Sequence, residues 1–146
     1  KKKNKFIHNH NNHAIKLLLY RAKNNFEKKI ENWKIKKNKI IVVGEEKEYK
    51  FLGKNFENFK KLNIVNFLSI TNNTNNISKM LKTIKKELFK KKFDEVLIAS
   101  FKYNFYLEEL FIKNNIKYYK IYNSTDRKLE NIFENKFISK YERGKL

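Results

Sequence analysis

The turn after the apolar run KIIVV, residues 39–43, is the first place in the chain where a ligand could bind. A single glycine, Gly44, follows the run, and a charged stretch with helical spacing comes directly after it. A strand, a glycine turn and a helix can hold a phosphate, but such sites need several glycines or the pattern GxxxxGK followed by Ser or Thr. Here Glu45 and Glu46 stand where the phosphate would lie, and their carboxylates would repel it. We therefore interpret this turn as helix capping rather than nucleotide binding.

Other residues capable of catalysis or metal binding form no complete site in the sequence. The tract HNHNNH, residues 8–13, has no cysteine or acidic neighbour, so we interpret it as solvated or RNA-facing. Glu108 and Glu109 would point about 100° apart on a helix, so they cannot face each other as an acid–base pair. Ser100 and Asn123 end predicted strands, where open α/β sheets hold ligands, but no candidate base accompanies either. We expect no enzymatic activity, no cofactor, no metal site and no small-molecule substrate.

The charge of the chain indicates a different class of partner. Its 146 residues include 35 Lys and Arg against 15 Asp and Glu, which gives a net charge of +20. A protein this basic suits a polyanion, and nucleic acid is the first candidate. An anionic membrane is the competing partner, but the chain has no apolar run of about 18 residues and no long helix with separate basic and apolar faces. The chain also lacks cysteine, which excludes disulfides and thiol nucleophiles.

The spacing of apolar residues predicts the elements that position these side chains. Steps of three and four predict helices, and short apolar runs predict strands. Helices are expected over residues 14–33, 45–59, 77–89 and 103–111, and strands over residues 39–43, 63–70, 95–100 and 116–122. A polar link is expected at residues 34–39, and a loop at 71–76 whose last residue, Asn76, caps the next helix. This alternation predicts an α/β fold with a mostly parallel sheet of about four to five strands, covered on both faces.

The composition divides the chain into a basic amino-terminal segment rich in Asn, His and Lys, residues 1–13, and a single α/β domain, residues 14–146. No repeat and no second composition regime indicates a further domain. Lys, Asn, Ile and Phe are frequent and Pro is absent, a bias that A/T-rich codons produce. We therefore expect an A/T-rich genome, such as that of an organelle.

Several phrases of the chain follow one known family in order and spacing. KIIVVGEEK, residues 39–47, stands where that family has KILFVGTK, and His13, Ile15 and Leu17 stand in its preceding phrase, hII(D/N)LxKT. VNFLSITNNTNNISKMLKTI, residues 65–84, stands where the family has VNxRWLGGxLTNxxTI. The chain thus resembles small-subunit ribosomal protein two, the S-two family of bacterial and organellar ribosomes.

The second half of the chain continues the resemblance with departures. FDEVLIAS, LEEL and NIKYYKIYNST follow the family order PDxxFVID, EA and GIPVIxIVDTN, with Ser100 and Asn123 where aspartates are expected. The Arg-Trp and double-glycine residues of the family are missing, and residues 67–72 stand in their place. The family also inserts a long helical hairpin, for which the chain has no room between Ile84 and Phe93.

The resemblance implies a Rossmann- or flavodoxin-like three-layer domain that lacks the helical hairpin insertion of the family. It also implies a non-enzymatic role as a structural constituent of the small ribosomal subunit, which binds rRNA and neighbouring ribosomal proteins. Together with the codon bias, the lost hairpin favours a ribosome of the mitochondrial matrix, and we do not expect a homo-oligomer. The alternatives are a nucleotide-dependent or RNA-processing α/β enzyme and an RNA-binding module outside the ribosome.

The residues predicted to contact RNA are polar or basic and lie at the ends of elements. Lysines there would neutralise phosphates, while Asn side chains would supply hydrogen bonds. They are Lys1, Lys2, Lys3, Lys5, His8, His10, Lys36, Lys37, Asn72, Asn73, Asn75, Asn76, Lys79 and Lys82. In a chain this basic, the lysine runs at residues 1–3, 36–39, 85–86 and 90–92 also favour phosphate contact over a merely solvated face.

Overall fold

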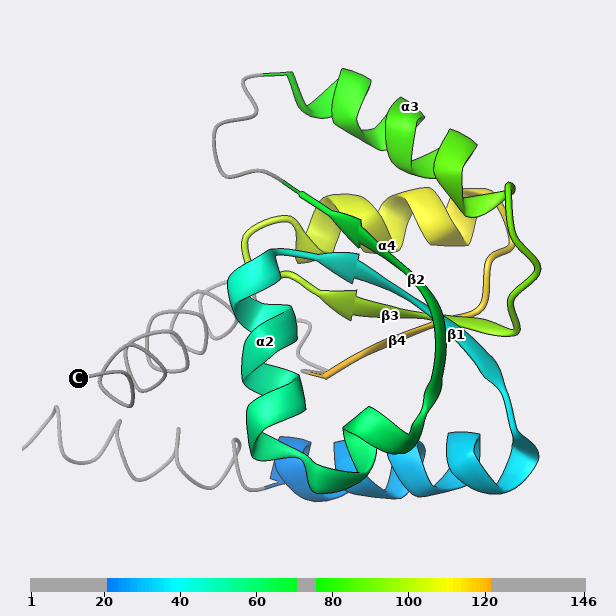
Figure 1. Cartoon of the computed structure of the whole chain (residues 1–146). Coiled ribbons are helices and arrows are strands. Elements are labelled where there is room, and N and C mark those ends of the chain that lie inside the picture. Colours follow the sequence, from blue (N-terminus) through cyan, green and yellow to red (C-terminus); the bar gives the residue numbers. More distant parts are fainter. Residues whose placement is uncertain (1–20, 71–75, 122–146) are drawn as a thin grey trace, which may run out of the picture.

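The computed structural model describes residues 21–70 and 76–121 and arranges them as an α/β domain (Figure 1). Residues 21–36 are helical and precede the first strand. The elements that follow are β1 (Lys39–Gly44), α2 (Glu46–Asn55), the 3-10 helix η1 (Glu57–Lys61), β2 (Asn63–Ser69), α3 (Ile77–Leu88), β3 (Glu95–Ala99), α4 (Asn104–Lys113) and β4 (Tyr118–Lys120).

The four strands form one sheet in the order β2-β1-β3-β4, and every pair is parallel. This confirms the predicted parallel sheet and the Rossmann- or flavodoxin-like class of fold. The chain passes from β1 to β2 on one side and then returns to place β3 on the other side of β1. The strand order therefore reverses between β1 and β3, which is where open sheets of this class usually bind ligands.

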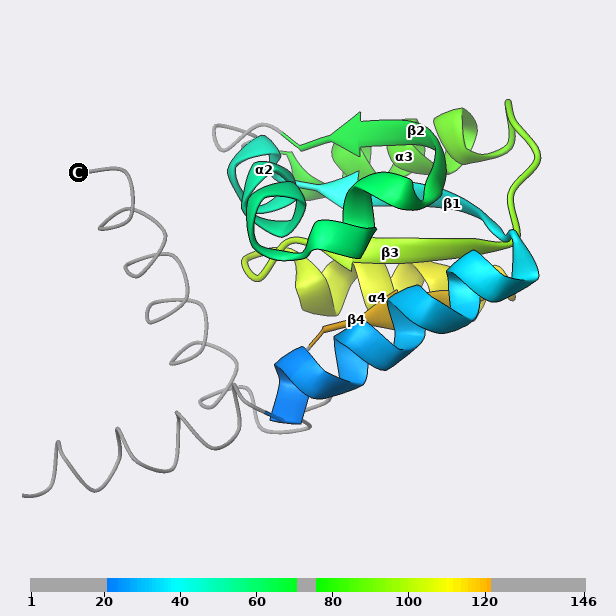
Figure 2. The same cartoon turned by 60° about the horizontal axis from the view of Figure 1, so that its bottom comes forward.

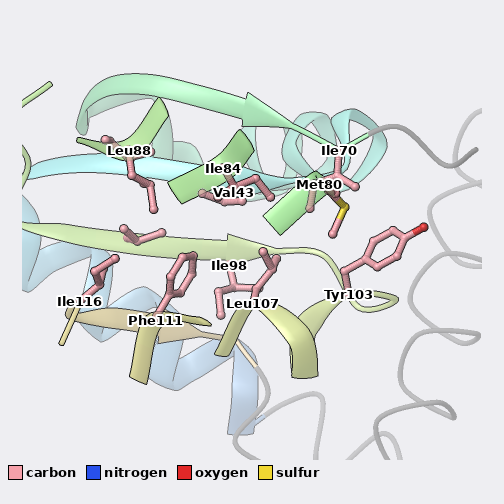
Figure 3. Packing of buried hydrophobic residues seen from close by; sticks show 12 residues of the cluster. Val43, Ile70, Met80, Ile84, Leu88, Ile98, Tyr103, Leu107, Phe111 and Ile116 are labelled. Atoms are coloured by element: carbon pink, nitrogen blue, oxygen red, sulfur yellow. The ribbon is translucent and has the colours of Figure 1, made fainter. Parts of the chain in front are cut away.

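Helices cover both faces of the sheet, as the sequence predicted. Successive side chains of β1 point to opposite faces, so Ile40 and Val42 join one core while Ile41 and Val43 join the other. The first core packs against the helical residues 21–36, α2 and η1, and the second packs against α3 and α4 (Figures 1 and 2). Figure 3 shows Ile84 of α3 and Leu107 and Phe111 of α4 among the side chains of the second core.

The structure corrects two predicted boundaries near the first core. The link predicted at residues 34–39 is wrong at its start, because the helix continues through Lys36. It ends in a Schellman motif: Lys37 has a φ of 55°, and the N–H groups of Lys37 and Asn38 donate to the carbonyls of Lys34 and Trp33 at 3.2 and 3.0 Å.

The helix predicted over residues 45–59 is also wrong at its end. The chain is extended at Phe56, with φ −122° and ψ 101°, so α2 stops at Asn55 and η1 follows. Phe56 packs edge-on against Phe26 at a ring distance of 4.9 Å, and Phe59 is buried in the same core. The break thus lets both rings reach the core. The strand predicted at 116–122 is shorter within the described chain, since β4 covers only Tyr118–Lys120.

A buried charge joins the helical residues 21–36 to the sheet. Glu95 begins β3 and is 1% exposed. The Lys29 Nζ lies 2.9 Å from its Oε2, and the Trp33 indole N–H donates to its Oε1 at 3.0 Å. The same Lys29 ammonium lies over the rings of Trp33 and Tyr119. Burial, and then the Glu95 carboxylate, raise the pKa of Tyr119.

No hairpin of helices interrupts the chain between α3 and β3. The segment from Ile77 to Leu88 is one helix, and β3 begins at Glu95 after a link of six residues, 89–94. This described stretch therefore agrees with the expectation that the chain lacks the helical hairpin of the family.

Candidate nucleic-acid interface

The central strands β1 and β3 approach each other closely where they end, at the edge of the sheet that we name the carboxyl edge. A Cβ atom added at Gly44 would lie 2.1 Å from the Ala99 carbonyl oxygen, which is backbone and cannot move aside. The same carbonyl accepts a hydrogen bond from the Glu45 N–H at 3.0 Å, and the Gly44 carbonyl accepts one from the Ile70 N–H at 2.8 Å. Gly44 thus serves the packing of β1 against β3, and the space that it leaves is filled by the protein itself.

Substitution at the two described glycines tests this role. Gly44→Ala forces β1 and β3 apart, so we expect it to lower the free energy of unfolding by about 3 kcal/mol or more. Gly53 lies within α2 with nothing within 4 Å of an added Cβ, so Gly53→Ala is the matched control and should stabilise the chain by about 0.5–1 kcal/mol. Urea denaturation followed by the fluorescence of Trp33 measures both. Equal effects of the two substitutions would contradict the close approach.

Buried polar groups fill the edge next to this contact. The Ser100 hydroxyl donates to Glu45 Oε1 at 3.2 Å and accepts from the Tyr103 N–H at 3.1 Å. The Phe101 N–H donates to the Glu48 carboxylate at 3.1 and 3.2 Å. These bonds tie the first turn of α2 to the loop after β3. The prediction that no candidate base accompanies Ser100 is therefore wrong; Asn123 lies outside the described residues.

The paired Ser100 and Glu45 have little access to a substrate. Ser100 is 4% exposed and Glu45 is 7% exposed. Burial raises the pKa of the Glu45 carboxyl, while the Ser100 hydrogen bond and the charges of Lys102 and Lys47 lower it by less. The arrangement is suited to holding α2 and the loop after β3 together.

A small cavity adjoins these groups between β3, α2 and α4. It holds about 20 Å³ of free space and is lined by side chains that include Glu48, Asn104 and Ile121. Within the described chain, the buried Asn104 Oδ1 has no hydrogen-bond partner. A volume of this size admits about one water molecule, which would satisfy that oxygen. The cavity is too small for a nucleotide, and the Glu48 carboxylate beside it would repel a phosphate.

The raised pKa of Glu45 predicts a dependence of stability on pH. An ionised carboxylate that is penalised by burial destabilises the fold, and this penalty is absent below the ordinary pKa of 4.5. We expect the stability of the unmodified chain to fall relative to Glu45→Gln as the pH rises from below 4.5 through the folded-state pKa to neutrality. Denaturation curves across this range measure the difference. Glu46→Gln, at an exposed neighbour that pairs with Lys50, is the control, and a trend of the same size against this variant would contradict a cause specific to Glu45.

The predicted RNA-contact residues that the structure describes lie at opposite edges of the sheet. Asn76 caps α3 by accepting a hydrogen bond from the Lys79 N–H at 3.1 Å, which confirms the predicted cap. Lys79 and Lys82 follow it on the first turns of α3, near the carboxyl edge. Lys36 ends the helix before β1 and Lys37 follows it, at the edge of the sheet where the strands begin. The other predicted contacts lie outside the described residues: Lys1, Lys2, Lys3, Lys5, His8, His10, Asn72, Asn73 and Asn75.

The solvent face of α3 extends the predicted contacts into a basic stripe. Lys79, Lys82 and Lys86 are exposed and follow steps of three and four, so they lie on one side of the helix. The opposite side carries the buried side chains Met80, Ile84 and Leu88. The only acidic residue of α3, Glu87, is paired with Lys90 at 2.7 Å. Lys86 belongs to the lysine run at residues 85–86 that the sequence favoured for phosphate contact, and its helical spacing from Lys79 and Lys82 places it on the same side of α3.

Other kinds of site are not found in the described part of the chain. No three His, Cys, Asp or Glu side chains among residues 21–70 and 76–121 are grouped so that they could hold a metal ion. The His tract at residues 8–13 lies outside these ranges. Within the same ranges, no helix is both long and apolar enough to cross a membrane.

The class of protein shown by the fold is a three-layer α/β domain with a parallel sheet. Comparison of the chain with protein-family models, with curated proteins and with solved structures gave no match. The assignment to a particular family therefore depends on the phrases of the sequence and is taken up as a proposal.

Proposed function

We propose that this protein is a structural constituent of the small subunit of a mitochondrial ribosome, where it binds rRNA and neighbouring ribosomal proteins. The observation that carries the proposal is the distribution of charge on a nucleotide-type fold. The usual ligand edge holds the buried carboxylates Glu45 and Glu48, whereas the exposed face of α3 carries lysines. Such a fold is suited to binding a polyanion on its surface.

The resemblance to small-subunit ribosomal protein two gives the proposal its particular form. The phrases around Gly44, Asn66 and Asn76 keep the order and spacing of that family. The net charge of +20 fits a protein embedded in rRNA, where lysines release counterions from phosphates. The codon bias and the missing hairpin support a location in the mitochondrial matrix.

RNA binding by α3 is tested with the purified full chain. The triple variant Lys79→Gln, Lys82→Gln, Lys86→Gln should reduce the slope of log K against log salt for a labelled RNA hairpin by about 2, since each lost phosphate contact lowers the slope by roughly 0.7–0.9. Fluorescence anisotropy at several salt concentrations measures the slope.

The matched control changes three exposed lysines on the other face of the sheet: Lys23→Gln, Lys28→Gln and Lys54→Gln. It removes the same charge as the α3 variant, but from a face that is not proposed to contact RNA. We therefore expect it to change the slope by less than about 1. Equal losses in the two triple variants would contradict a binding role for the α3 face.

The ribosomal assignment is tested by sedimentation of an extract of mitochondria from the source organism. We expect the protein, followed by mass spectrometry, to travel with small-subunit markers and to remain there in moderate salt. Gradients without magnesium serve as the control, because the ribosomal particles then dissociate and the markers shift. Recovery of the protein at the top of both gradients would favour an RNA-binding module outside the ribosome.

An α/β enzyme is the second candidate, and the hydrogen bond from Ser100 to Glu45 is the observation in its favour. Both side chains are buried, so this function requires an opening of the carboxyl edge. Calorimetric titration of the full chain with ATP and GTP tests it. Tight binding that is lost in a folded Ser100→Ala variant would support the enzyme, and no binding would leave the ribosomal proposal the better supported one.

A further inference from the structure

The amino ends of all four strands lie side by side at one edge of the sheet, which we name the amino edge. Lys39 at the start of β1 pairs with Asn63 at the start of β2, and Ile40 pairs with Glu95 at the start of β3. Tyr118 at the start of β4 pairs with Val96 of β3. The segments that lead into the strands must therefore converge, and in Figure 1 the end of the helical residues 21–36 and the links before β3 and β4 lie on the right.

Lysines stand at the end of the first two of these segments. Lys36, Lys37 and Lys39 lead into β1, and Lys60 and Lys61 end η1 just before β2; all five are exposed. These groups are distant in the sequence, yet the pairing of Lys39 with Asn63 places them next to each other. The parallel sheet thus gathers separate lysine runs into one surface.

The segments before β3 and β4 add to the same surface. Lys91 and Lys92 are exposed in the link to β3, and the Lys91 Nζ donates to the Val65 carbonyl of β2 at 3.2 Å. Lys117 precedes β4, and its carbonyl accepts the Val96 N–H at 2.9 Å. Every described strand therefore begins beside at least one exposed lysine.

Few acidic groups offset this charge. The Asp94 Oδ2 accepts the Lys39 backbone N–H at 2.7 Å, and Glu57 is exposed at the start of η1. Glu95 is buried and pairs with Lys29 at 2.9 Å, with Lys117 farther away at 3.6 Å. The described part of the amino edge thus has a clear excess of positive charge.

Helix dipoles explain only part of this pattern. Cations favour helix carboxyl ends, which also lie at the amino edge in this fold. Lys37, Lys91, Lys92 and Lys117, however, stand outside every helix. Lys37 also has a φ of 55°, a conformation that glycine adopts more easily. A lysine therefore occupies a position that the backbone alone would give to glycine.

An exposed aromatic ring accompanies the lysines. Phe89 caps the carboxyl end of α3, is 62% exposed and comes shortly before Lys91 and Lys92 in the link to β3. Lysines beside an exposed ring are typical of surfaces that hold the phosphates of unpaired RNA and stack its bases.

We propose that the amino edge is the principal RNA-binding surface of this protein, with its lysines on the phosphates of a single-stranded segment and Phe89 stacked on a base. The fold thus binds RNA at the edge opposite to the one that nucleotide-binding α/β proteins use. This inference rests on the proposed RNA-binding function and names the surface that performs it.

The test compares three triple variants of the purified full chain on a labelled oligouridine of about 20 nucleotides. The edge variant is Lys37→Gln, Lys61→Gln, Lys92→Gln; the α3 variant and the control variant are those described above. We expect the edge variant to bind the oligouridine at least about tenfold more weakly with a salt slope lower by about 2, the α3 variant to lose clearly less affinity than the edge variant, and the control variant to change by less than about twofold.

Several outcomes would overturn the inference. If the unmodified chain does not bind the oligouridine in low salt, the RNA-binding function fails and the inference fails with it. If the unmodified chain binds but the edge variant loses no more affinity than the control or the α3 variant, the inference alone is wrong. Tighter binding to vesicles containing phosphatidylserine than to the oligouridine, lost in the edge variant, would assign the edge to a membrane instead.

Two single variants separate binding from folding. Lys37→Gly removes one charge and relieves the positive φ, so we expect a higher melting temperature together with weaker RNA binding. Phe89→Ala should weaken binding to the oligouridine by about threefold or more, but leave binding to an RNA duplex unchanged, because paired bases are not free to stack. Unchanged oligouridine binding in both variants would contradict the proposed contacts.

Discussion

The close contact between Gly44 and Ala99 is the constraint on which the rest of the structure depends. Because no side chain stands at residue 44, β1 and β3 pair along their full length to the carboxyl edge. This pairing brings Glu45 beside Ser100 and fills the position where a fold of this class would receive a phosphate. A glycine that looks like part of a ligand site in the sequence is thus required for the packing of the protein against itself.

Local patterns were sufficient to predict most of the secondary structure. The apolar runs before Gly44 and Ser100 predicted buried parallel strands, and Asn76 was identified as a cap because it precedes an apolar helical pattern. The break at Phe56 could not be predicted in this way. Phe56 and Phe59 are three residues apart, a spacing that fits one turn of an α-helix as well as the bend that the structure shows, and only packing against Phe26 distinguishes them.

The candidate sites were harder to predict because they combine distant parts of the chain. Ser100 and Glu45 are brought together by the order of the strands, which the sequence does not specify, although both were expected at a carboxyl edge. Lys36 and Lys37 were predicted as contacts and Lys92 lies in a lysine run that was favoured for phosphate contact, but Lys61 was not predicted. The expected parallel sheet already implied that the segments before all strands share one edge. The amino edge could therefore have been predicted from the sequence.

The lysines of the amino edge also affect the protein when nothing is bound to them. Like charges held close together repel one another, and unfolding relieves that repulsion by separating the segments. Ions in solution screen this repulsion, so the stability of the free chain depends on ionic strength. A polyanion bound at this edge would reduce the same repulsion between lysines. Its binding would therefore stabilise the folded chain against unfolding. The same repulsion between lysines would therefore link the stability of the fold to the binding of a polyanion.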